Sequence, residues 1–336
     1  MTNTRRTRVL IEYQGVDITT ELEDYLSNFV FSDNEGRADE IQIDLQDKRK
    51  RWQKPWLPGD GDIIKATIKT YNWNKRNEVL RLRCGTFYVD DVSFKGPPDS
   101  VSIKAVSVPF AAGGKDTKRS RAWEDVSLNT IAGDIAVASK LALIYDAPNV
   151  YYDRVDQSKE TDLGFLKRLA KKEGLSIKVT NDQLVVYHQL TYEKKKAVRT
   201  ITRGDSDVLS WDFSKSAAEK QYKKVEITYF DAAKKKKVKY TYDVPDVAEG
   251  PTLKLNRRAK TIAEAKRWAI IEARNKNKNG KVGKLTMAGA IDLVQGLTID
   301  IKNFGAFDGK YIIESCSHNP TGKYEVNLDI RGVLKY

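Results

Sequence analysis

Residues 40–46 alternate strictly between apolar and polar side chains. Ile41, Ile43 and Leu45 fall on one face of an extended segment, which is the period of a half-buried β-strand. Similar runs recur through residues 1–108, and turn-forming Gly, Pro, Asn and Asp residues separate them at 32–36, 58–61, 72–77 and 96–99. Many short strands at regular spacing predict a β-barrel or a β-sandwich.

The pattern changes after residue 108. Residues 109–124 are rich in Gly, Ala and charged side chains, so we predict a linker there. From Ser127 onward the apolar positions follow a helical period, and Ser127 suits the N-cap position. The predicted apolar stripe of this helix consists of Leu128, Ile131, Ile135 and Ala138.

A second helix and a hairpin are predicted within residues 156–190. Thr161 or Ser158 can cap the helix, and Gly174 suits the position just after its end. Its buried stripe is predicted to be Leu163, Leu166, Leu169 and Ala170. The runs LSIKV and QLVVYH flank an Asn-Asp turn and predict a hairpin. Caps and a solvated helix face therefore explain the many charges of this stretch, and the pattern predicts a small α+β domain.

Residues 198–336 return to the strand pattern, with one helix expected at 261–274. Thr261 and Glu264 form a capping box, and the apolar stripe of the helix is Ile262, Ala265, Ala269 and Ala273. The fold is therefore predicted to be mainly β with an α+β insert. The expected division is a first β-barrel domain (1–108), a linker (109–124), a small α+β domain (125–197) and a second β-barrel domain (198–336). Two β segments around an α+β segment hint at a duplicated architecture.

Composition is that of an ordinary soluble globular protein. The 336 residues are 40% hydrophobic and 31% charged, and this length is enough for two or three domains with real cores. No apolar run approaches the roughly 20 residues that cross a bilayer. The arginine-rich start is not followed by the apolar segment of a signal peptide, so we expect an unsecreted protein without a membrane segment.

The charge of the chain is positive and uneven. Net charge is +13 overall, with −1 in residues 1–100, +5 in residues 101–200 and +9 in residues 201–336. The densest basic block runs from residue 254 to 284, where 11 basic residues face two glutamates. Such a field attracts nucleic acid or an acidic protein surface.

Residues that usually carry chemistry do not form a recognisable constellation. His188 and His318 are far apart and stand in no metal-binding pattern. Cys84 and Cys316 have no sequence-local catalytic partner and are expected to be buried thiols. Nucleophile-elbow and Walker motifs are absent, and the sequence singles out no pair of carboxylates. We therefore predict that the chain is not an enzyme, with no catalytic residue, no metal ligand and no cofactor.

The basic residues are the remaining candidates for a binding surface. Four consecutive lysines fit a solvated hairpin tip, and the basic helix carries Trp268 among its cations. A basic helix with an aromatic side chain can bind phosphates, or it can meet an acidic neighbour in an assembly. The candidate interaction residues are Lys234, Lys235, Lys236, Lys237, Arg257, Arg258, Lys266 and Arg267.

Several stretches together resemble one known family. They are GVDITTELEDYLSNFVFSDNEGRADEIQIDLQDKRKRW, WLPGDGDIIKATI and LRCGTFYVDDVSFKGPPDSVSIKA, followed by the spacing Q-x-x-E-T-D-L-x-F-L-x-R-L-A-x-x-x-G over residues 157–174. The chain resembles the baseplate hub proteins of contractile phage tails and phage-tail-like bacteriocins, also called the late control protein D family. The resemblance implies two tail-tube-like β-barrels joined by smaller domains.

The resemblance also implies a function and partners. It implies a homotrimer with pseudo-sixfold symmetry that joins a hexameric tail tube to a trimeric central spike. Other baseplate proteins would surround it, and tape-measure protein or nucleic acid would meet it only in the lumen. The protein would be made in the bacterial cytoplasm and built into the tail. The chain is expected to leave no room for a cell-wall-degrading extension. A nucleic-acid-binding module and the distal protein of a non-contractile tail remain the alternatives.

Overall fold

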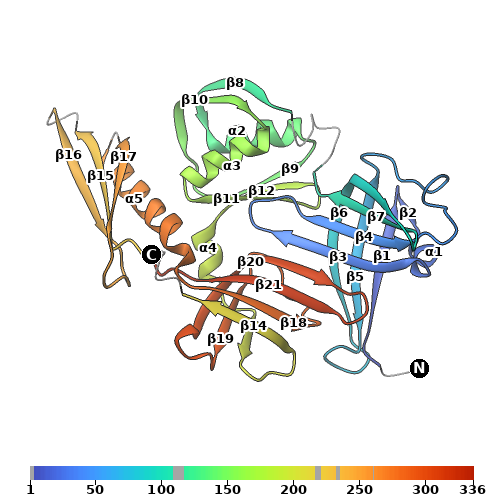
Figure 1. Ribbon diagram of the computed structural model, residues 1–336. Helices are drawn as coiled ribbons and strands as arrows, with labels where there is room; N and C mark the ends of the chain where they lie inside the picture. Colours follow the sequence, from blue (N-terminus) through green and yellow to red (C-terminus); the bar gives the residue numbers. More distant parts are fainter. Residues whose placement is uncertain (1–3, 109–116, 216–220, 232–234, 260) are drawn as a thin grey trace.

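The computed structural model describes residues 4–108, 117–215, 221–231, 235–259 and 261–336, and Figure 1 shows their arrangement. The described strands form one large sheet and three small ones. The large sheet occupies the lower and right-hand parts of Figure 1, and the middle of the chain lies above it. A small sheet with one helix projects to the left.

The first β unit supplies seven strands of the large sheet. Their spatial order is β3-β4-β7-β6-β5-β1-β2, and all neighbouring pairs are antiparallel. The predicted alternation is confirmed in β4, where Ile41, Ile43 and Leu45 are buried. The elements are β1 (Arg6–Tyr13), β2 (Val16–Asp17), α1 (Thr19–Glu23), β3 (Leu26–Asn34), β4 (Glu40–Gln46), β5 (Ile63–Tyr71), β6 (Val79–Lys95) and β7 (Ser100–Val106).

The second β unit supplies the other six strands, in the order β14-β18-β21-β20-β19-β13. Strand β20 also pairs with β3 of the first unit, so both units belong to one 13-stranded sheet. The mainly β prediction is confirmed, although no strand pair among the described residues closes either unit into a barrel. The elements are β13 (Arg199–Thr202), β14 (Val208–Ser214), η1 (Lys278–Gly280), β18 (Val282–Ala288), β19 (Thr298–Lys302), η2 (Gly305–Phe307), β20 (Gly309–Asn319) and β21 (Glu325–Gly332).

The two β units repeat one architecture. The order β3-β4-β7-β6-β5 in the first unit corresponds to β14-β18-β21-β20-β19 in the second. The repeat ends there, because β1 is antiparallel to β5 whereas β13 is parallel to β19. The register shift at Leu26–Asn28 recurs at Val208–Ser210, and the shift at Val89–Asp91 recurs at Ile313–Ser315. Because a bulge inserts one residue at a defined place in a ladder, these shared shifts align the two units residue by residue. One hydrophobic core runs through both units.

The middle of the chain forms the predicted α+β unit. Ser127 and Thr161 cap its two longer helices by accepting hydrogen bonds from the backbone nitrogens of Thr130 and Gly164. Thr161, rather than Ser158, is therefore the cap. The predicted hairpin is confirmed as β11 and β12, with β9 added in parallel. The elements are β8 (Arg119–Ser127), α2 (Leu128–Ala138), β9 (Ala142–Asp146), β10 (Tyr151–Glu160), α3 (Asp162–Lys172), β11 (Leu175–Thr180), β12 (Gln183–His188) and α4 (Gln189–Lys194).

The predicted linker at 109–124 is wrong where the structure describes it. Residues 109–116 lie outside the described residues, but residues 119–124 belong to β8, which pairs antiparallel with β10. One face of this strand is half-buried and the other is exposed, but the half-buried face carries Arg119 and Arg121, so no apolar alternation reveals the strand in the sequence. Backbone pairing stabilises the strand instead, together with the Arg121 guanidinium that lies 4.5 Å from the ring centroid of Trp123.

A third small unit is inserted between β14 and β18. It consists of β15 (Lys224–Asp231), β16 (Lys236–Asp243), β17 (Thr252–Ala259) and α5 (Ile262–Asn277). We expected these strands within the second β-barrel domain, but they form a separate three-stranded sheet. Thr261 caps α5 as predicted. Ile262 was wrongly placed on the buried stripe, because its side chain is 57% exposed while Trp268 is buried instead.

Candidate functional site

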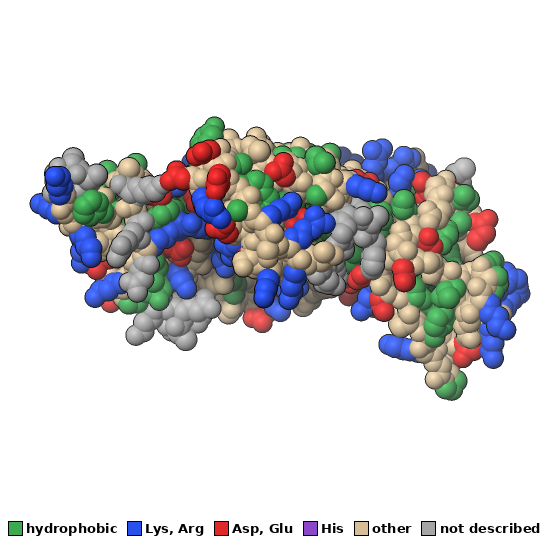
Figure 2. All heavy atoms as spheres, turned by 90° about the horizontal axis from the view of Figure 1, so that it is seen from above, with side chains coloured by type: hydrophobic (Ala, Val, Ile, Leu, Met, Phe, Trp, Pro, Cys, Tyr) green, Lys and Arg blue, Asp and Glu red, His purple; other side chains and the backbone are tan. Residues whose placement is uncertain are grey.

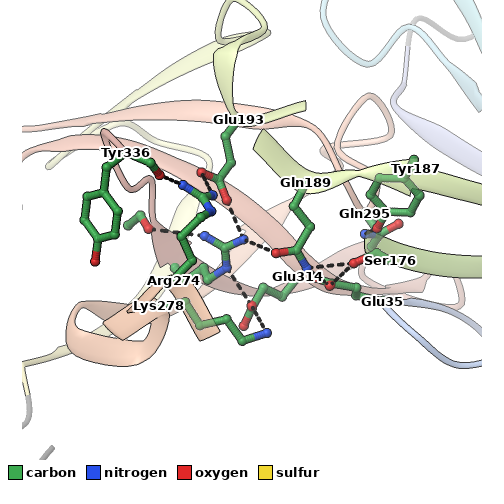
Figure 3. A network of polar contacts seen from close by, with 12 residues as sticks. Glu35, Ser176, Tyr187, Gln189, Glu193, Arg274, Lys278, Gln295, Glu314 and Tyr336 are labelled. Atoms are coloured by element: carbon green, nitrogen blue, oxygen red, sulfur yellow. Dashed lines mark hydrogen bonds and ion pairs between the residues drawn. The ribbon is translucent and has the colours of Figure 1, made fainter. Parts of the chain in front are cut away.

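A network of buried and half-buried polar side chains lies where the units meet (Figure 3). We call it the polar junction. Helix α4 lies next to β20 and β21 and carries two of its members. The others come from the first β unit, the α+β unit, α5 and the second β unit, and the whole set is Glu35, Ser176, Gln189, Glu193, Arg274, Glu314 and Arg331.

Glu193 is the centre of the polar junction. Its side chain is fully buried, and its two oxygens accept hydrogen bonds from Arg274 Nη2 at 2.6 Å and Arg331 Nη2 at 2.7 Å. The side chain of Arg331 is only 1% exposed and also donates from Nε to Glu314 at 2.8 Å. Removing one partner of such a buried set leaves an uncompensated charge. The network therefore ties α4, α5, β20 and β21 together.

A second part of the junction reaches the first β unit. Gln189 Nε2 donates to Ser176 Oγ at 2.7 Å, and Ser176 Oγ donates to Glu35 Oε1 at 2.8 Å. Gln189 also donates directly to Glu35. Glu35 follows β3, so the α+β unit is hydrogen-bonded to the first β unit as well as to the second. The arrangement fixes the relative position of four parts of the chain.

A separate group of charges holds the third unit against the α+β unit. Glu173, at the end of α3, is buried, and its oxygens lie 3.8 Å from Arg257 and 3.2 Å from Arg267. The guanidinium of Arg257 also lies 3.2 Å from the ring centroid of Trp268. Two of the predicted interaction residues are thus used inside the molecule. The aromatic side chain that we expected on a phosphate-binding surface is buried.

The other predicted interaction residues lie on the surface or outside the described part. Lys235, Lys236 and Lys237 are exposed at the β15–β16 hairpin, which agrees with a solvated tip. Lys266 is exposed on α5. Lys234 and the side chain of Arg258 lie outside the described residues. Figure 2 shows Lys and Arg side chains prominent at the left-hand end, where this unit lies. Their part in partner binding stays a prediction.

Two carboxylates and one lysine are buried between the first β unit and the α+β unit. Lys178 pairs with Asp33 and lies 3.8 Å from Asp39, whose residue is only 1% exposed. Burial raises the pKa of Asp39 to about 7. The sequence signal for this group was weak, since Lys178 is one cation in an otherwise ordinary apolar strand.

The histidines and cysteines have structural environments. His318 is fully buried between the hydroxyl of Tyr324 and the carbonyl of Leu293, and burial lowers its pKa to about 4. Cys84 and Cys316 are buried and free, as predicted, and burial raises their pKa values. The described residues contain no group of three His, Cys, Asp or Glu side chains that could hold a metal ion.

One apolar cavity of about 270 Å³ lies in the first β unit, lined chiefly by Ile11, Ile18, Leu22, Trp52 and Trp56. It lacks the convergent polar groups of a catalytic pocket. Within the described ranges, no helix is long and apolar enough to span a membrane.

Comparison with known proteins identifies the family. A family model described as phage tail baseplate hub (GPD) matches residues 81–322. The chain belongs to the phage tail baseplate hub family. The resemblance drawn from the sequence is thereby confirmed. Because this family is one of tail structural components, the prediction of a non-enzymatic baseplate protein is confirmed with it.

Curated relatives and a solved structure agree with this family. The probable baseplate hub protein of Escherichia phage P2 is 32% identical over 198 residues, which is 57% of this chain and 49% of the relative. The corresponding protein of phage 186 is 29% identical over 205 residues, 59% of this chain and 50% of the relative. The chain thus spans about half the length of the curated relatives it matches. The 43 kDa tail protein of prophage MuSo2 from Shewanella oneidensis shares the fold, with a TM-score of 0.72, 15% identity and coverage of 96% and 98%.

Proposed function

We propose that three copies of this chain close into a ring with pseudo-sixfold symmetry, which adapts a hexameric tail tube to a trimeric central spike. The repeated strand order of the two β units carries this proposal. Three chains with two equivalent units each present six similar faces around an axis. The same ring still has threefold symmetry, so it matches a sixfold partner on one side and a threefold partner on the other.

The polar junction supports this adaptor role. A ring of alternating units needs a fixed angle between the two units of each chain. The shared sheet across β20 and β3 and the buried pairs around Glu193 both restrict that angle. In this proposal the other baseplate proteins bind the outer units, and tape-measure protein or DNA passes through the lumen.

Two other functions are the alternatives to this adaptor role. The distal protein of a non-contractile tail would use the same body, and only its partners distinguish it. A nucleic-acid-binding module is disfavoured, because Arg257, Arg267 and Arg274 are paired with buried carboxylates and are not presented together on a surface. Binding to DNA that weakens steeply with salt would favour the module.

The experiment that tests the ring is the solution mass of the purified chain, measured by light scattering with and without the candidate spike protein. A ring gives a species of three times 38.1 kDa, alone or in the mixture. A chain that stays monomeric at all concentrations and ignores the spike contradicts the proposal.

A further inference from the structure

The two β units of one chain are joined where β20 pairs with β3, and we call this contact the internal joint. Strand β20 pairs antiparallel with β3, and Ser317 lies opposite Ser32 while His318 lies opposite Phe31. The rings of His318 and Phe31 stack with centroids 6.0 Å apart. Both of these side chains are buried. A short run of strand pairing with a stacked aromatic pair therefore joins the first unit to the second.

Each strand of this joint has a counterpart in the other unit. Strand β6 occupies the place of β20, and β14 occupies the place of β3. The shared register shift aligns Asp91 of β6 with Ser315 of β20, so Ser93 corresponds to Ser317 and Phe94 to His318.

The same alignment holds for the other strand. The shift at Val208–Ser210 matches that at Leu26–Asn28. Ser214 therefore corresponds to Ser32 and Phe213 to Phe31. Four positions of the internal joint thus have four equivalents that do not meet within one chain.

These equivalent edges lack a neighbour in the part of the chain that the structure describes. Strand β14 ends the order of the large sheet and pairs only with β18. On β6, the pairing with β5 stops at Tyr88, so the end at Asp91–Lys95 has only β7 beside it. An edge strand presents unpaired backbone donors and acceptors, which can pair with another chain.

Equivalent positions of the two units differ in burial, and the neighbouring strand missing, within the described residues, beside β14 and the end of β6 explains the difference. His318 is fully buried, whereas its counterpart Phe94 is 42% exposed. Phe29 of β3 is fully buried, whereas its counterpart Trp211 of β14 is 46% exposed. Leu209, also on β14, is 50% exposed. Aromatic side chains occupy both members of the pairs His318/Phe94 and Phe29/Trp211, but only the internal joint covers them.

We propose that β14 of one copy pairs antiparallel with the Asp91–Lys95 end of β6 of the next copy. Ser214 then lies opposite Ser93, and Phe213 lies opposite Phe94. The next pair in this register places Asp212 opposite Lys95, and opposite charges across a strand pair are favourable. The partner is a second copy of this chain.

This contact rests on the proposed ring, of which it is the repeated element. Each copy offers one β14 edge and one β6 edge, so the contact is heterologous and continues around an axis until it closes. It alternates with the internal joint around the ring. A pseudo-sixfold arrangement follows because all six joints use equivalent residues.

The register is tested by disulfide cross-linking of the full chain. Residues directly opposite across an antiparallel pair have Cα atoms about 4.5–5.5 Å apart, which is within the range that a disulfide spans. The test variant carries Ser93→Cys and Ser214→Cys. The matched positive control carries Ser32→Cys and Ser317→Cys, which occupy the equivalent positions of the internal joint. An offset control combines Ser93→Cys with Ser210→Cys.

After mild oxidation, the test variant should give covalent dimers and trimers on a non-reducing gel. The internal control should form its disulfide without a change in mass. Mixing a chain with Ser93→Cys alone and a chain with Ser214→Cys alone should give covalent dimers and nothing larger. Neither of these single variants should cross-link efficiently by itself.

The outcomes separate this contact from the ring. A chain that forms trimers by light scattering but does not cross-link in the test variant overturns the β14–β6 contact and leaves the ring standing. Equal cross-linking of the offset control overturns the register. A chain that neither oligomerises nor cross-links, while the internal control oxidises normally, overturns both.

Discussion

Substitution of Glu193 by Gln should destabilise the protein more than any surface charge change. The substitution keeps the shape of the side chain but removes its negative charge from a site that is fully buried. Arg331, 1% exposed, then keeps Glu314 as an ionic partner, and Arg274 loses its carboxylate. Removing one partner of a buried ion pair costs about 3–5 kcal/mol. Because Glu314 still neutralises Arg331 in part, we expect a loss of about 3 kcal/mol in the free energy of unfolding.

Urea denaturation followed by tryptophan fluorescence measures this loss. The matched control is Glu124→Gln, because Glu124 pairs with Arg154 at 2.7 Å but is 66% exposed. An exposed pair of this kind contributes about 0–1 kcal/mol. A split transition in Glu193→Gln alone would show that the junction couples the units during unfolding. Equal losses in the two variants would refute the view that the junction holds the units together.

Three further tests, with five substitutions in all, examine individual structural statements by the same denaturation assay. Burial raises the pKa of Asp39 from 3.8 to about 7. The protonated carboxyl therefore contributes to the stability of the folded protein fully below about pH 4, and this contribution is lost as pH rises through about 7. Between about pH 4 and 8, the free energy of unfolding of Asp39→Asn should therefore rise relative to that of the unsubstituted chain. A difference between the two that does not change with pH would contradict this. Thr161→Ala should lose about 1 kcal/mol through the lost N-cap, while Ser158→Ala should not. Ile262→Ser should change the free energy of unfolding by less than about 0.5 kcal/mol, whereas Trp268→Ala should lower it by about 3–5 kcal/mol. Similar losses in the two variants would indicate that Ile262 belongs to the buried stripe of α5, as the sequence predicted.

The candidate interaction residues show where sequence reasoning reached its limit. Arg257 and Arg267 were predicted as a surface for partners because they belong to a dense basic block. The structure pairs both of them with Glu173, which lies more than 80 positions earlier in the chain. No sequence pattern singled out Glu173 or Glu193. Only their burial, which depends on distant segments, distinguishes them from solvated side chains.

The small α+β unit was largely predictable because its signals are local. The caps at Ser127 and Thr161 are set by hydrogen bonds that span three residues. The left-handed backbone of Gly174, with φ +72°, is a property of one residue at a helix end. Strand β8 was missed because its half-buried face carries two arginines, Arg119 and Arg121, beside Trp123, so that no apolar alternation marks the strand in the sequence.

The sequence alone determined most of the helices and strands, the mainly β character and the family. These follow from patterns within a few turns of chain and from the order of short motifs. Only the tertiary structure decided that Ser32 and Ser317 face each other, that the third unit has its own sheet, and that two units share their bulges. Such features depend on the register of strands far apart in sequence. That register is fixed by burial and backbone pairing in three dimensions, and no local pattern encodes it.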